Sequence, residues 1–232
     1  MLLIRGIGTW PSGGLSGAFL TAGALEEGVK LTLALLFLRR LEVEARIGPA
    51  EAAIVLACLG AGFEAVEDFQ YLIGGLSQGI PWGEVVAARA LPMHLALGLA
   101  CGGYLAGALA GRPWRFLLSW VLACVLHGGF NSVAGSATFS LTAGYAGGVA
   151  LWGFSSFFIW HRRSPWALRR RLSHMDPWEA AQEAHSLGWN GMALLFSEKA
   201  RSPAAWWVLA LGVGILYPLL VLGLGLLMEA VV

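Results

Sequence analysis

Nine polar side chains of this sequence lie inside long apolar stretches, where such residues are rare. They are Glu26, Glu27, Lys30, Glu64, Glu67, Asp68, His94, His127 and Asn131. An ionisable group at the centre of a membrane costs about 2.5 to 3.5 kcal/mol on insertion scales. Five carboxylates together would therefore cost about as much as the whole stability of a domain. A cost of this size indicates a function beyond packing.

The residue types suit hydrolysis of an amide bond by an activated water molecule. A carboxylate held away from bulk water is a competent general base, and a nearby histidine can share the water or protonate the leaving amine. An asparagine amide can donate to the oxyanion. We expect these roles to fall to one catalytic set, which needs no serine or cysteine nucleophile: Glu26, Glu27, Glu67, His94, His127 and Asn131.

The sequence leaves the need for a metal open, and we expect no cofactor. A zinc ion could be bound by His94, His127 and a glutamate of the same set. No HExxH motif favours such an ion. The three cysteines lie in apolar runs without CxxC spacing, so a thiolate metal site and a disulfide framework are both disfavoured.

Some of the polar residues have a purely structural interpretation. Lys30 lies one turn after Glu26, close enough for an ion pair that only joins helices. Glu64 and Asp68 are also one turn apart, and we expect them to be structural, one of them facing a wet crevice or the outer headgroups.

The elements that must position these residues are membrane helices. The chain has 232 residues, of which 57% are hydrophobic and 12% charged, whereas soluble domains have roughly 25% charged residues. Its mean hydropathy is +0.69. We predict an all-α, polytopic bundle of about six spans, near residues 15–38, 49–75, 91–111, 114–137, 141–160 and 204–228. The net charge of +1 indicates no nucleic-acid partner.

The loops between these spans predict their orientation. Arginines follow the first, third and fifth spans, while residues 76–90 and 138–140 are poor in them, so the first span should enter from outside. Counted from the outer helix ends at 1.5 Å per residue, Glu26 then lies ~17 Å deep, Glu67 ~12 Å and His127 ~16 Å. His94 lies near the outer end of the third span, so four helices would contribute to one layer.

Three regions follow from this organisation. We expect residues 1–160 to form the core, 161–203 a cytoplasmic basic and amphipathic segment, and 204–232 the final span. In the second region, Asp176, Pro177 and Glu179 predict the start of an amphipathic helix that includes Trp178, Leu187 and Trp189.

Four motifs in order resemble the PrsW family of intramembrane proteases, related to CAAX prenyl proteases and bacteriocin-immunity proteins. They are Glu26-Glu27-x-x-Lys30, Phe63-x-x-x-Glu67-x-x-x-Tyr71, His94-x-x-x-Gly98 and His127-x-x-x-Asn131. The resemblance implies that Glu26 and Glu27 are the base candidates, that Glu67 and His94 assist, and that His127 and Asn131 bind the water or the oxyanion. Lys30, Phe63, Tyr71 and Gly98 would support them. It also implies a single-span membrane substrate, such as an anti-sigma factor, cut near the outer side of a prokaryotic plasma membrane.

Other functions remain open. Asn131 stands where PrsW proteins usually have aspartate and looks more like the CAAX branch, which makes a CAAX-protease-like peptidase an alternative. The same acids could form the pathway of a small proton or cation transporter, although no repeat of broken helices is visible. A non-catalytic scaffold or immunity protein is a further alternative. Gly14-Leu15-Ser16-Gly17 matches the GxSG of rhomboid proteases, but Ser16 lies at the mouth of the first span.

Overall fold

The computed structural model describes residues 17–42, 47–81, 92–136 and 139–162, with 174–176, 178, 179 and 182. In this part of the chain every regular element is a helix, which confirms the predicted all-α class. In chain order these are the π-helix η1 (Ala18–Glu26) and the α-helices α2 (Glu27–Glu42), α3 (Pro49–Ser77), α5 (Met93–Leu109), α6 (Trp114–Ser136) and α7 (Phe139–Arg162).

Five of the six predicted segments coincide with helices of the structure. The first of them is two elements, because its outer part is a π-helix, which the sequence analysis did not predict. The sixth, 204–228, lies outside the described residues. Within the part of the chain that the structure describes, two helices are long and apolar enough to cross a membrane, Pro49–Ser77 and Trp114–Ala134, and Met93–Leu109 is a shorter apolar helix. The number of spans therefore stays a prediction.

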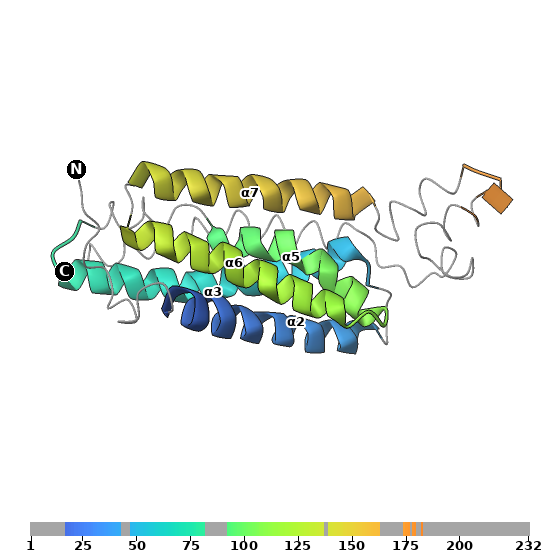
Figure 1. Ribbon diagram of the computed structural model, residues 1–232, viewed down its shortest axis with the longest axis horizontal. Coiled ribbons are helices and arrows are strands. Elements are labelled where there is room, and N and C mark those ends of the chain that lie inside the picture. The colour runs from blue at the N-terminus through green and yellow to red at the C-terminus, as the bar shows by residue number, and fades with distance from the viewer. Residues whose placement is uncertain are drawn as a thin grey trace.

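The helices lie side by side along the long axis of the molecule (Figure 1). Helix α5 is almost completely buried and packs against α3, α6 and α7. Its contact with α3 is close, because a Cβ at Gly98 would lie 2.4 Å from the Cα of Ala57, and one at Gly102 would lie 2.4 Å from that of Ala53. Glycine in α5 thus lets the two backbones meet, as small residues do in membrane bundles.

Local sequence explains where the central helices begin and end. Pro49 occupies the first turn of α3, where its missing N–H costs nothing. Gly79 and Gly111 follow α3 and α5 with φ of 72° and 81°, a backbone conformation that favours glycine and ends a helix. After the turn at Gly111 the chain reverses direction and continues as α6.

Polar and apolar side chains are arranged as expected for a protein in lipid. The buried apolar core includes Leu31, Leu38 and Leu105, which lie between α2, α3, α5 and α6. The outer faces of α2, α6 and α7 expose large apolar side chains, among them Leu33, Phe37, Val121, Val125, Leu151 and Phe158. The buried polar residues gather instead inside the bundle.

Little of the predicted segment 161–203 can be compared. The backbone N–H of Trp178 donates to Oδ1 of Asp176 at 2.8 Å, in agreement with a helix start at Asp176. Leu187 and Trp189 lie outside the described residues, so the amphipathic helix stays a prediction.

Candidate active site

The two adjacent glutamates lie at the junction between a π-helix and an α-helix. Glu26 is the last residue of η1 and Glu27 the first of α2. Side chains of α6 hold this junction, because the indole N–H of Trp120 donates to the carbonyl of Ala24 at 2.9 Å and the thiol of Cys124 donates to that of Gly23 at 3.2 Å. Short π-helical segments frequently occur at functional sites.

Glu27 is the anchor of a buried network. Its Oε1 accepts from the ammonium of Lys30 at 2.5 Å and from Nδ1 of His127 at 2.7 Å, and it lies 3.4 Å from Nδ1 of His94. The exposed fractions of the Glu27, Lys30 and His127 residues are only 3 to 5%. The expected ion pair of Lys30 with Glu26 was wrong: because the α-helix begins at Glu27, the pair forms three residues apart, from Glu27 to Lys30.

His94 joins this network to α3. Its Nδ1 lies 2.6 Å from the ammonium of Lys30, and its Nε2 lies 3.1 Å from Oε2 of Glu67. An ammonium only donates, so Nδ1 of His94 accepts and Nε2 carries the proton that is donated to Glu67. The Lys30 ammonium also lies 4.4 Å from the centre of the Phe63 ring, a cation–π contact.

His127 is held by the carboxylate of Glu27. A carboxylate without a proton only accepts, so Nδ1 of His127 donates to Glu27, and in the neutral imidazole Nε2 then keeps a lone pair. The rings of His94 and His127 are edge to face, with centroids 4.6 Å apart. In this neutral tautomer, Nε2 of His127 can accept a hydrogen bond from water or bind a metal ion.

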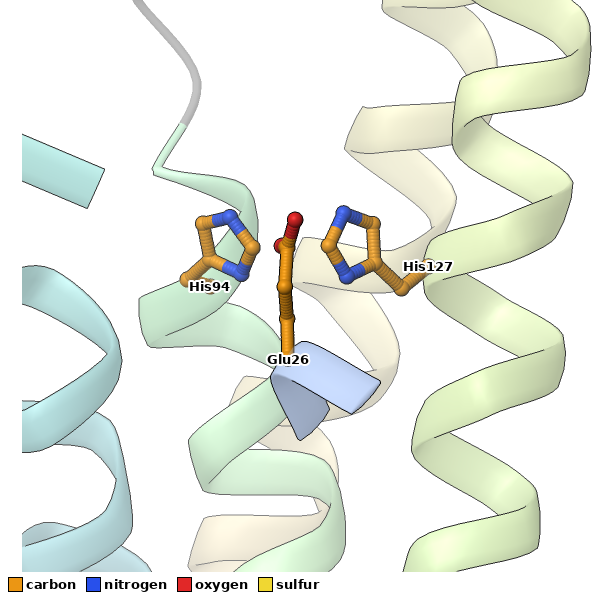
Figure 2. A group of neighbouring side chains, drawn as sticks. All are labelled: Glu26, His94 and His127. Atoms are coloured by element: carbon orange, nitrogen blue, oxygen red, sulfur yellow. The ribbon is translucent and has the colours of Figure 1, made fainter. Parts of the chain in front are cut away.

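Glu26 lies between the two histidines, one from α5 and the other from α6 (Figure 2). Its Oε2 is buried and has no hydrogen-bond partner in the described part of the chain. One ligand atom from each of Glu26, His94 and His127 lies within 4.8 Å of the others. This site, which we call the Glu26 site, combines a carboxylate oxygen and an imidazole nitrogen that are both available.

The structure brings together most of the predicted set. Glu26, Glu27, Glu67, His94 and His127 meet in one place, and Lys30 and Phe63 contact them. Asn131 is half-buried one turn beyond His127, and within the described residues it makes no hydrogen bond to this network. Tyr71 lies on α3 one turn beyond Glu67, and Gly98 belongs to the contact between α3 and α5.

Glu64 and Asp68, for which we expect structural roles, are both buried. Glu64 and Asp68 are 1% and 3% exposed, so the idea that one of them faces a crevice or the headgroups was wrong. Glu64 instead accepts from backbone N–H groups at the start of α5. Sequence reasoning also missed Trp120, although an indole one turn before Cys124 on the His127 helix was a visible signal.

Comparison with known families matches most of the chain to a family model. The model described as "PrsW family intramembrane metalloprotease" matches residues 5–161, about two thirds of the 232 residues. This range contains every residue of the Glu26 site. Comparison with curated proteins gives no match, and comparison with solved structures gives none either.

Proposed function

This chain belongs to the PrsW family of intramembrane proteases, and from its site we propose that it cleaves a single-span membrane protein with a water molecule activated by Glu26. One observation carries the proposal: a carboxylate with an unpartnered buried oxygen lies between two histidines from separate helices. Five of the six residues expected to be catalytic meet here, and Asn131 lies one turn beyond His127.

The proposed base is Glu26, and Glu27 organises the site. Glu27 already accepts from Lys30 and His127, so its oxygen Oε1 is occupied. Glu26 keeps a free oxygen that can accept a proton from water. The attacking oxygen forms a bond to the substrate carbonyl carbon while its proton passes to the Glu26 carboxylate.

The other members of the set then have distinct roles. His127, held by Glu27 through Nδ1, binds the water through Nε2, and Glu26 returns the proton to the leaving amine. Asn131 follows His127 by one turn, and its amide can donate to the oxyanion. Glu67 and Lys30 fix the ring of His94 from both sides.

The residues present also fit a divalent metal ion, which the family description implies. Two imidazoles and a carboxylate are a common donor set for catalytic zinc, and the hydrogen bond from His127 to Glu27 is of the type that orients a metal ligand. His94 would exchange one of its two hydrogen bonds to bind the ion. A bound ion would activate the water and polarise the carbonyl.

We propose that the substrate reaches the site from the outer side of the membrane, in agreement with the orientation predicted from the arginines. The family resemblance gives anti-sigma factors as one class of candidates. A CAAX-type substrate would instead present a short terminal peptide. The position of the cut, within a single-span protein or near a chain end, therefore distinguishes these two kinds of substrate.

Mapping of new protein termini tests the function. The purified protein is reconstituted with bacterial membrane vesicles, and new termini are identified by mass spectrometry. We expect termini within single-span proteins, reduced about 100-fold or more in Glu26→Gln. Glu51→Gln is the matched control, because Glu51 is a largely buried acid 16 residues before Glu67 on α3. Equal products from wild type and Glu26→Gln would refute the proposal, and ion flux without products would favour the transporter.

Chelation tests the metal separately. The enzyme is treated with EDTA and passed through gel filtration, and Zn²⁺ is then added back. If the ion is required, cleavage should be lost after the first step and return after the second. Unchanged cleavage after chelation, with no zinc found by elemental analysis, would support the expectation of a cofactor-free enzyme.

A further inference from the structure

Helix α5 begins without a side-chain cap from the residue that precedes it. The residue before it is Pro92, whose side chain has no oxygen or nitrogen to accept from the first N–H groups. Four N–H groups at a helix start lack intrahelical partners, and here those of Met93, His94 and Leu95 belong to buried residues, so they need an acceptor from the protein. The residues concerned include His94, the second residue of α5.

Glu64 of α3 supplies the missing acceptors. Its Oε1 accepts from the N–H of Met93 at 2.6 Å and its Oε2 from that of His94 at 3.2 Å, while the N–H of Leu95 lies 3.5 Å from Oε2. A side chain 29 and 30 residues away in sequence thus takes the place of a local cap. The negative charge also opposes the positive end of the helix dipole.

One face of α3 contacts both the backbone and the imidazole ring of His94. One turn before Glu64, a Cβ at Gly60 would lie only 2.3 Å from the carbonyl oxygen of His94, so the backbones touch there. Phe63 packs edge to face on the imidazole at 5.1 Å, and Glu67 accepts from Nε2. Glu64 holds the backbone of the residue whose ring the others hold.

We propose that Glu64 is a positioning residue of the active site, which fixes the backbone of His94 so that its ring stays between Glu67 and the Glu27 network. This inference rests on the proposed function, because it assigns Glu64 to the same reaction. A misplacement of a reacting group by about 1 Å can cost 100-fold in rate. Glu64 touches no reacting atom and acts through His94.

The test compares E64Q with wild type on a quenched fluorescent peptide that spans the mapped cut. Gln keeps one acceptor but turns N–H donors toward the N–H groups of α5. We expect kcat to fall about 10- to 100-fold while KM stays within twofold. E51Q, the same change 13 residues earlier on α3, should keep both constants.

A second change tests the capping explanation directly. In the E64Q background, P92D places a carboxylate at the N-cap position, from which it can accept the N–H of His94 or Leu95. We expect this double variant to recover at least part of the lost kcat. If E64Q does not purify as a folded protein, E64D, which keeps the charge but shortens the reach, replaces it in both comparisons.

A readout independent of catalysis separates the two proposals. The chain has five histidines, so selective ¹⁵N-histidine labelling gives few amide signals. The His94 amide proton should move upfield in E64Q while that of His127 stays. An E64Q enzyme with wild-type kcat, an unmoved His94 amide, or a loss that P92D leaves unrestored would each overturn the positioning role. Absence of cleavage by wild type would overturn the proposed function instead, and the amide signal would then decide the role of Glu64.

Discussion

Glu26 and Glu27 are neighbours in the chain but have opposite surroundings. Glu27 is 4% exposed and accepts from an ammonium and an imidazole, whereas Glu26 is half-buried with one oxygen unpartnered. The difference arises because consecutive residues of a helix point about 100° apart. The pair of glutamates therefore gives one carboxylate with a free oxygen, which is the proposed base, and one whose contacts organise the site.

Removing the organising carboxylate should cost stability as well as activity. In E27Q the ammonium of Lys30, which is 5% exposed, stays buried without its counter-charge. Breaking a buried ion pair in this way costs about 3–5 kcal/mol. Denaturant unfolding in detergent measures the loss. E26Q is the control, and we expect it to lose cleavage but less than about 1 kcal/mol of stability.

The double variant E27Q/K30M gives the complementary result. With both charges removed, no uncompensated charge is buried, so the free energy of unfolding should recover toward that of wild type while cleavage stays absent. An E27Q protein as stable as E26Q would contradict the anchoring role of Glu27.

The sequence predicted the members of the site better than their contacts. The types and helical spacing of Glu67, His94 and His127 were sufficient to predict that they meet. The predicted partner of Lys30 was wrong, because the choice between Glu26 and Glu27 depends on the residue at which η1 ends. The capping role of Glu64 depends on the packing of α3 on α5, which local spacing does not reveal.

At the scale of elements, the junction of η1 and α2 depends on α6. Trp120 donates to Ala24, two residues before Glu26, and Gly28 leaves room for its indole, since a Cβ there would lie 3.2 Å from Nε1. The helices pass each other in opposite directions, as the contacts of Gly23 with Cys124 and of Gly128 with Phe19 show. The direction in which Glu26 points is therefore set by a different helix.

Replacing Trp120 with Phe should disturb this junction. The change removes the indole donor, while the carbonyl of Ala24 still accepts from the backbone N–H of Glu27, so the expected cost is that of one hydrogen bond, about 0.5–1.5 kcal/mol. We expect lower stability and a several-fold lower kcat, measured by unfolding and by peptide cleavage. W114F is the control, because Trp114 is 58% exposed on the same helix. Equal effects of the two changes would argue against a specific role of the indole N–H.

The contact between α3 and α5 gives a second prediction at this scale. In G98A the new methyl group would meet the backbone of Ala57, so the helices must separate near His94. Overpacking of this kind typically costs about 1–3 kcal/mol. We expect reduced stability and cleavage in G98A, and no change in G62A, because a Cβ at Gly62 meets nothing within 4 Å. If G98A kept the stability and the cleavage rate of wild type, the close contact between α3 and α5 would not be needed for either.

At the scale of the whole molecule, charge is divided between the two ends of the bundle. Because neighbouring segments of the chain run in opposite directions, the last turn of α2, the start of α6 with the turn before it, and the last turn of α7 lie at one end. Their arginines are Arg39, Arg40, Arg112, Arg115 and Arg162. The Glu26 site lies toward the opposite end, near the start of α5. Basic ends of membrane helices stay in the cytoplasm, so we expect the site to lie in the outer half of the membrane.

Single cysteines test this orientation in intact cells. Cys58 and Cys101 are first replaced by Ala and Cys124 by Ser, which keeps a donor for Gly23. Gln78 follows α3 at the end near the site and Ala110 follows α5 at the basic end, and both are exposed. We expect a membrane-impermeant maleimide to label Q78C in whole cells and A110C only after the membrane is opened, because arginines beside Ala110 hold that end inside. Labelling of A110C alone in intact cells would place the Glu26 site toward the cytoplasm. Cleavage would then have to occur on the inner side, and the arginines could not be the residues that orient this bundle.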